Sequence, residues 1–400
     1  MGLDFPFVDS PVKREIIEAC DYGQASGDWN PLLKRLNIAL RNNELVGPFY
    51  LHAKMAVGGP EVDNHVILEV DNENIRWMHK FWDSLGGFEI IQKRFAEFYG
   101  EEPEPPIHFP ARILAANPDS NIAHPFVVAW FLHEYLAGIK QENLAFLCGV
   151  EIVTSWEVRF EKVFRPAAKL LLDAESEKVL SGMLDAHPFG AVTTVYASLH
   201  DCGHALGYQK CLPQSPAFAQ YMPPHWYGAM GELATDMATV AFFSEMVPSA
   251  SSMVLHQRLF DYTYKTEMAD PFQEGINIQF DMLGEAIAFE HFRKHGALTP
   301  VDDQWHLDMP KVVAAAKELL VDLETLAKEL SEDVTVGRSE VVYEKGKAFI
   351  ARYLTWEDGR GWLVGEDLRR YVTKLSALPL RLDRSMMDSR YPLQSTLLTA

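Results

Sequence analysis

The 400-residue sequence is poor in cysteine and in basic residues. Four cysteines without a C-x-x-C pair exclude a disulfide-dense secreted scaffold and favour a reducing compartment, so we expect a cytoplasmic protein. The formal net charge of -20 argues against nucleic acid and against anionic membrane surfaces as partners. No apolar run is long enough to span a membrane, and the N-terminus lacks the basic and apolar regions of a signal peptide.

The apolar residues that are present follow mainly a helical period. Helical patterns run through residues 10–45, 76–99, 124–182, 190–207, 228–246, 277–295 and 309–331. β-Branched and alternating residues at 49–53 and 65–70 predict a strand pair, and Val334-Thr335-Val336 predicts a further short strand. We therefore expect a mainly α fold with a minor β component, that is, an α+β class.

Length and one acidic, proline-rich stretch divide the chain into three expected regions. Four hundred residues suggest two or three domains, and residues 101–110 look like a break between two of them. We expect an N-terminal α/β region over 1–105, a helical metal-binding catalytic region over 106–310, and a mostly helical C-terminal region over 311–400.

One short stretch carries most of the chemical information. His200 and His204 lie four residues apart, with Asp201 directly after the first. On a helix, positions i and i+4 share a face, so two neutral imidazoles there can bind one metal ion. Further on, Gly231-Glu232-Leu233-Ala234-Thr235-Asp236 offers carboxylates at the same spacing. Two histidines and one glutamate, with a fourth position open, are the ligand set of a hydrolytic zinc site.

The spacing of the histidines says little by itself, because His291 and His295 repeat it. The residues around the first pair say more. His200-Asp201-Cys202-Gly203-His204-Ala205-Leu206-Gly207 resembles the H-E-x-G-H-A-L-G helix of zincin metallopeptidases, with Asp in place of the usual Glu. The stretch from Met230 to Asp236 resembles the G-E-x-x-x-D helix of the gluzincins, the thermolysin- and fungalysin-like group. The resemblance covers residues 193–243 and implies a zincin-like helical core around the motif.

The resemblance also implies a metal site. His200, His204 and Glu232 would bind one divalent metal ion, with zinc expected and Fe(II) as the alternative. The later carboxylate, Asp236, would lie behind the ligands and orient one imidazole.

Two further residues receive catalytic roles from the same resemblance. Asp201 would take the position of the general base, although its side chain is one methylene shorter than that of Glu. His291 would steady the tetrahedral oxyanion, with His295 as the second candidate. The expected reaction is hydrolysis of an amide bond in a peptide or small molecule by metal-activated water.

Three other interpretations remain open. Leu199-His200-Asp201-x-Gly203-His204 also resembles the signature of HD-domain phosphohydrolases, in which Asp201 would itself be a ligand. That family needs an upstream ligand histidine, and the sequence between Trp156 and Leu184 contains none. A non-haem iron oxygenase uses the same two-His-one-carboxylate set. A non-catalytic interaction protein would hold metal weakly or not at all, and the sequence leaves the oligomeric state open.

Overall fold

The computed structural model of the chain describes residues 11–45, 47–55, 61–123, 129–131, 148–211, 221–261, 280–338, 340–375 and 378. Within these residues the fold is mainly helical with a small sheet component, which confirms the predicted α+β class. None of the described helices combines the length and the apolar character needed to cross a membrane.

The helices of the described residues are α1 (Pro11–Ser26), α2 (Asn30–Arg41), α3 (Asn72–Leu85), α4 (Glu89–Tyr99), α6 (Val153–Arg159), the π-helix η1 (Phe160–Phe164), α7 (Arg165–Leu171), α8 (Ala174–Asp185), α9 (Phe189–His204), α10 (Gly207–Cys211), α11 (Pro224–Phe243), α12 (Pro248–Phe260), α14 (Phe280–Lys294), α15 (Met309–Thr335), α16 (Glu340–Ile350) and α17 (Glu366–Leu375). The strands are β1 (Pro48–Met55), β2 (Val62–Val70), β3 (Ile107–Ala116), β4 (Ala129–Phe131), β5 (Cys148–Ile152), β6 (Leu298–Val301), β7 (Gln304–Leu307), β8 (Thr355–Glu357) and β9 (Gly361–Leu363).

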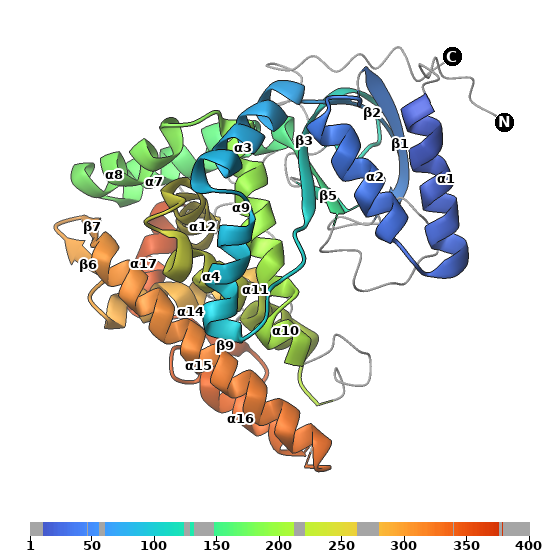
Figure 1. Cartoon of the computed structure of the whole chain (residues 1–400). Helices are drawn as coiled ribbons and strands as arrows, with labels where there is room; N and C mark the ends of the chain where they lie inside the picture. The colour runs from blue at the N-terminus through green and yellow to red at the C-terminus, as the bar shows by residue number, and fades with distance from the viewer. Residues whose placement is uncertain are drawn as a thin grey trace.

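The main sheet has the order β1-β2-β3-β5-β4, and α1 and α2 lie beside it (Figure 1). The antiparallel pairing of β1 with β2 confirms the predicted strand pair. Alternate residues of β2 are buried, since successive side chains of a strand point to opposite faces. Val66 and Leu68 pack there with Phe109 of β3 and Val150 of β5 in one apolar cluster. Strand β3 runs parallel to β5 and antiparallel to β2.

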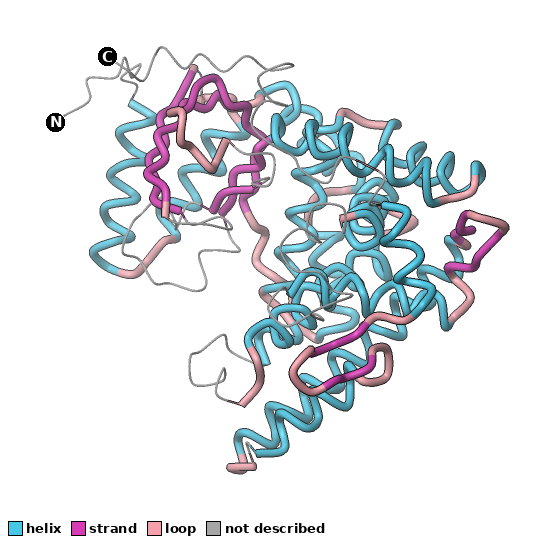
Figure 2. Tube along the Cα trace, turned by 180° about the vertical axis from the view of Figure 1, so that it is seen from behind, coloured by secondary structure: helices cyan, strands magenta, loops and turns pink. Residues whose placement is uncertain are grey.

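Helix α9 lies between the sheet and the helical body of the molecule. It packs against β3 on one side and against α11 and α12 on the other, and the tube view shows the same division between strands and helices (Figure 2). Nearly every residue of α9 is buried, which is why its apolar residues surround the helix instead of forming one stripe. The two helices that carry the sequence motifs are therefore neighbours in the interior.

The helical body is held together by one large apolar cluster. This cluster runs in sequence from Met78 to Leu375 and joins residues of α3, α9, α11, α15 and α17. It draws on all three regions expected from the sequence, whose boundaries stay a prediction.

The predicted strand over Val334-Thr335-Val336 is wrong, because α15 continues to Thr335. Buried leucines at 319, 323, 326 and 330 keep a helical stripe against the body of the molecule. That packing outweighs the β propensity of the two valines.

Candidate metal centre

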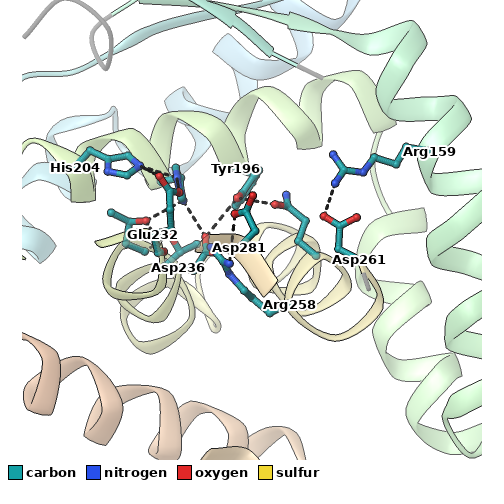
Figure 3. A network of polar contacts seen from close by, with 12 residues as sticks. Arg159, Tyr196, His204, Glu232, Asp236, Arg258, Asp261 and Asp281 are labelled. Atoms are coloured by element: carbon teal, nitrogen blue, oxygen red, sulfur yellow. Dashed lines mark hydrogen bonds and ion pairs between the residues drawn. The ribbon is translucent and has the colours of Figure 1, made fainter. Parts of the chain in front are cut away.

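Two helices bring their paired polar side chains face to face. The last turn of α9 carries His200 and His204, and α11 carries Glu232. His200 Nε2 lies 3.1 Å from Glu232 Oε2, and His204 Nε2 lies 3.5 Å from Glu232 Oε1. The two Nε2 atoms are 2.8 Å apart. Two ring nitrogens and one carboxylate therefore converge on one point, beside the labelled His204 and Glu232 of Figure 3.

This donor set suits a zinc ion. Zinc prefers imidazole and carboxylate ligands, and a tetrahedral ion with bonds of about 2.0–2.1 Å separates its ligand atoms by about 3.3 Å. The three separations in the structure lie within about half an ångström of that value. Asp201 also offers an oxygen within 4.8 Å of one ring nitrogen each of His200 and His204.

Asp236 lies directly behind the first histidine. Its Oδ1 is 2.8 Å from His200 Nδ1, and the hydroxyl of Thr235 is 3.0 Å from the same nitrogen. A proton on Nδ1 that is donated to the carboxylate leaves the Nε2 lone pair free to bind a metal ion. The ring is thereby held in the tautomer and orientation that ligation requires.

The Asp236 carboxylate is in turn held by further donors from neighbouring helices (Figure 3). Arg258 of α12 donates its Nε–H to Oδ2, and the Tyr196 hydroxyl lies 3.3 Å from Oδ1. Burial opposes ionisation of Asp236, but the charges of Arg258 and His200 outweigh it and lower the pKa of this carboxyl. Asp236 is therefore a buried anion with fixed partners.

The glycine inside the first motif permits the close approach of the two helices. A Cβ atom at Gly203 would lie 2.9 Å from Thr235 Cβ and 3.0 Å from Thr235 Cα. Backbone cannot yield as a flexible side-chain end can, so a larger residue would force α9 away from α11. The same approach brings His200 within reach of Asp236.

Asp201 contacts a residue that the sequence analysis does not single out. Its Oδ2 lies 2.7 Å from Nε2 of His108 in β3. The other ring nitrogen of His108 lies 3.1 Å from Glu151 Oε1 in β5, and the Trp156 indole donates to Glu151 Oε2 at 2.9 Å. Burial alone would lower the pKa of His108, but the carboxylates of Asp201 and Glu151 raise it to about 9. An isolated histidine in a proline-rich stretch is the only signal of this contact in the sequence.

His291 has a different setting from the one expected of an oxyanion-stabilising residue. Its Nε2 lies 2.8 Å from the carbonyl oxygen of Ala315, and its Nδ1 lies 3.2 Å from the hydroxyl of Tyr353. The structure thus brings His291 to α15 and Tyr353, and its catalytic role stays a prediction. With His295 and Glu318 it forms a second group of potential metal ligands.

The structure thus defines a mainly helical protein built around a cluster of two histidines and one glutamate. No protein-family model matches the chain, and no curated protein matches it either. Two solved structures have a similar fold: DPP III from Caldithrix abyssi, with 13% identity and a TM-score of 0.58, and dipeptidyl-peptidase III from Corallococcus sp. strain EGB, with 14% identity and the same TM-score.

The similarity extends over nearly the whole of this chain, 94% and 95% respectively. The chain spans about two thirds of the length of each neighbour, 67% and 66%. At such low identity the similarity shows the fold alone.

Proposed function

We propose that the chain is a zinc-dependent peptidase of the zincin kind, which cleaves an amide bond in a peptide or a small molecule. The convergence of His200, His204 and Glu232 carries the proposal. The order of these residues along the chain, with Asp236 after the glutamate, favours the gluzincin group. Similarity in fold to two dipeptidyl-peptidases supports a peptide substrate over other amides.

The side chains divide the work between binding and proton transfer. His200, His204 and Glu232 would hold the metal, and Asp236 keeps the first imidazole in its ligating tautomer. A zinc ion bound there supplies Lewis acidity, which acidifies a water and polarises a carbonyl. Asp201 accepts the proton of the attacking water and returns it to the leaving amine.

Metal content and peptide hydrolysis of the same variants test the proposal. Protein purified without added metal is expected to contain one equivalent of zinc, and chelation should abolish the cleavage of dipeptidyl reporter substrates. His204→Ala and Glu232→Ala should each lose both the metal and the activity. His295→Ala, in the second histidine pair, is the matched control and should keep both. Stoichiometric zinc in both of the first two variants would overturn the assignment.

One further substitution separates the other interpretations. Asp201→Ala should leave the zinc in place and remove proton transfer if Asp201 is the base. Loss of metal from this variant, together with phosphate release from nucleotides by the wild type, would favour an HD-type phosphohydrolase. Bound iron with oxygen consumption would favour an oxygenase.

A further inference from the structure

We propose that His108 is a positioning residue, which fixes the carboxylate of Asp201 for proton transfer. This inference rests on the proposed function, since it assigns a role within that reaction. It concerns a residue of β3, far from the metal motifs in the sequence and adjacent to the active-site acid in the fold.

The first argument is that both ends of the His108 ring have carboxylate partners. Nε2 lies 2.7 Å from Asp201 and Nδ1 lies 3.1 Å from Glu151. Glu151 is itself fixed by the indole N–H of Trp156 at 2.9 Å. A rotation of the imidazole would leave two buried carboxylates without this cation, which is costly in the protein interior. The ring is therefore a rigid link between the sheet and α9.

The second argument concerns the short side chain of Asp201. Asp201 reaches less far than the Glu that zincins use, so small errors in its orientation cost more of its reach toward the water. His108 Nε2 forms an ion pair with Asp201 Oδ2 at 2.7 Å, and a carboxylate has a second oxygen that can accept a proton. Asp201 also offers an oxygen within 4.8 Å of ligand atoms of both motif histidines. Because the carboxylate is planar, a contact that holds one oxygen orients the whole group.

The third argument is that the contact between His108 and Asp201 is shielded from water. The side chains of His108 and Glu151 are both 1% exposed, and that of Asp201 is 5% exposed. Water therefore has little access to replace the imidazole as a donor. β3 packs directly along α9, so the backbone on both sides of the contact is held as well.

Two amide substitutions at one position test the proposal. The amide nitrogen of Gln lies about as far along the side chain as Nε2 of His, and that of Asn lies about where Nδ1 does. His108→Gln should keep a donor toward Asp201, and kcat should stay within about tenfold of the wild type. His108→Asn keeps only the donor toward Glu151, and kcat should fall about 100-fold with KM and zinc content unchanged.

A matched control separates catalysis from general destabilisation. His256 of α12 is fully buried, and its ring nitrogen lies 2.8 Å from the carbonyl oxygen of Ser252. His256→Ala should lower the unfolding temperature without changing kcat. If His108→Asn fails to fold, the comparison of His108→Gln with the wild type and the cycle below still decide the question.

The double-mutant cycle uses the Asp201→Ala background. With the acid gone, a further substitution of His108 by Asn or Gln should change kcat by less than about threefold, because coupled residues are not additive. Equal fold-losses in both backgrounds, full kcat in His108→Asn, or loss of zinc from His108→Gln would overturn the positioning role. An active wild type with no coupling overturns this role alone, and a zinc-loaded wild type that cleaves no peptide overturns the proposed function with it.

Discussion

The molecule contains two pairs of histidines with the same spacing and different surroundings. His200 and His204 lie on α9, and His291 and His295 lie on α14. Each pair has a nearby acid and each forms a group that could hold a metal ion. In the first pair both Nε2 atoms lie close to the Glu232 carboxylate, whereas the first ring of the second pair has other partners at both nitrogens.

The comparison teaches that the first ring of each pair is set up differently for metal binding. At His200 the remote nitrogen, Nδ1, meets the Asp236 carboxylate and Nε2 faces Glu232, whereas at His291 Nδ1 meets the Tyr353 hydroxyl and Nε2 meets the Ala315 carbonyl oxygen. The pKa values follow the same division. Burial alone would lower the pKa of His200, but its carboxylate partners raise it well above the ordinary value. At His291 burial dominates and lowers the pKa to about 4.

The glutamate beside each pair, Glu232 for the first and Glu318 for the second, offers the sharpest test of this contrast. Glu232→Gln should weaken zinc binding by at least about 100-fold and lower kcat/KM by at least about 1,000-fold, because a charged ligand becomes a neutral one. Glu318→Gln, in the second pair, should change neither. Zinc titration and peptide hydrolysis measure both effects. Equal effects of the two substitutions would break the comparison.

Substitution of the residue that contacts Nδ1 of the first ring should have the next largest effect. Asp236→Asn is expected to weaken zinc binding about 10- to 100-fold, because the amide holds the His200 ring less firmly. Tyr353→Phe removes the corresponding contact from His291 and should leave zinc binding unchanged. Competition with a chelator of known affinity measures the difference. An unchanged affinity in Asp236→Asn would show that the ring needs no such support.

The close approach of α9 and α11 distinguishes the first pair as well. Gly203→Ala should lower the free energy of unfolding by about 2 kcal/mol, since its Cβ would meet the Thr235 backbone. Gly182→Ala, on α8, meets nothing within 4 Å and should raise it by about 0.5–1 kcal/mol. Denaturant titration gives both values. A stable Gly203→Ala variant would mean that the helices can separate freely.

The smallest expected effect concerns Glu324, a half-buried acid outside the histidine cluster. Burial would raise the pKa of Glu232, but His204 and His200 lower it well below the ordinary value. Glu324 of α15 accepts a hydrogen bond from the Tyr99 hydroxyl, and burial raises its pKa to about 7. The folded chain therefore binds a proton there between pH 4.5 and about 7 that the unfolded chain does not, so stability falls as pH rises through this range.

Glu324→Gln should remove this loss. Between pH 5 and pH 8 the free energy of unfolding of the variant should therefore fall less than that of the wild type, by on the order of 1 kcal/mol. Glu332→Gln, an exposed acid on the same helix, is the control and should not alter the pH dependence. Denaturant titrations at the two pH values measure the change. A pH dependence identical to that of the wild type would show that Glu324 is solvated.

The helices that carry the cluster were within reach of sequence analysis. Periodicity over 190–207 and 228–246 predicts α9 and α11 to within a few residues, because apolar residues and flanking prolines mark both helices. Each motif carries polar side chains at helical spacing, which the sequence shows directly. This spacing lets the polar faces of the two helices meet. Local pattern is sufficient in this part of the molecule.

The contact between Asp201 and His108 was beyond sequence analysis. Strand β3 begins inside the stretch 101–110, which reads as a break because of its prolines. Its pairing with β5 joins segments that are distant along the chain, and no local period encodes such a contact. The setting of His291 was missed for the same reason, since Ala315 and Tyr353 come from later elements.

The central place of β3 has a consequence for truncation. Its neighbours are β2 on one side and β5 on the other, and its His108 contacts Asp201, which follows the proposed metal ligand His200. A fragment that starts at residue 106 would keep both sequence motifs and lose β1 and β2. Strand β3 would then have an open edge, and the support of Asp201 would loosen while the proposed zinc ligands stayed in the fragment. The described part of the N-terminal hundred residues would thus act as a scaffold for the proposed site, whose three ligands come from α9 and α11.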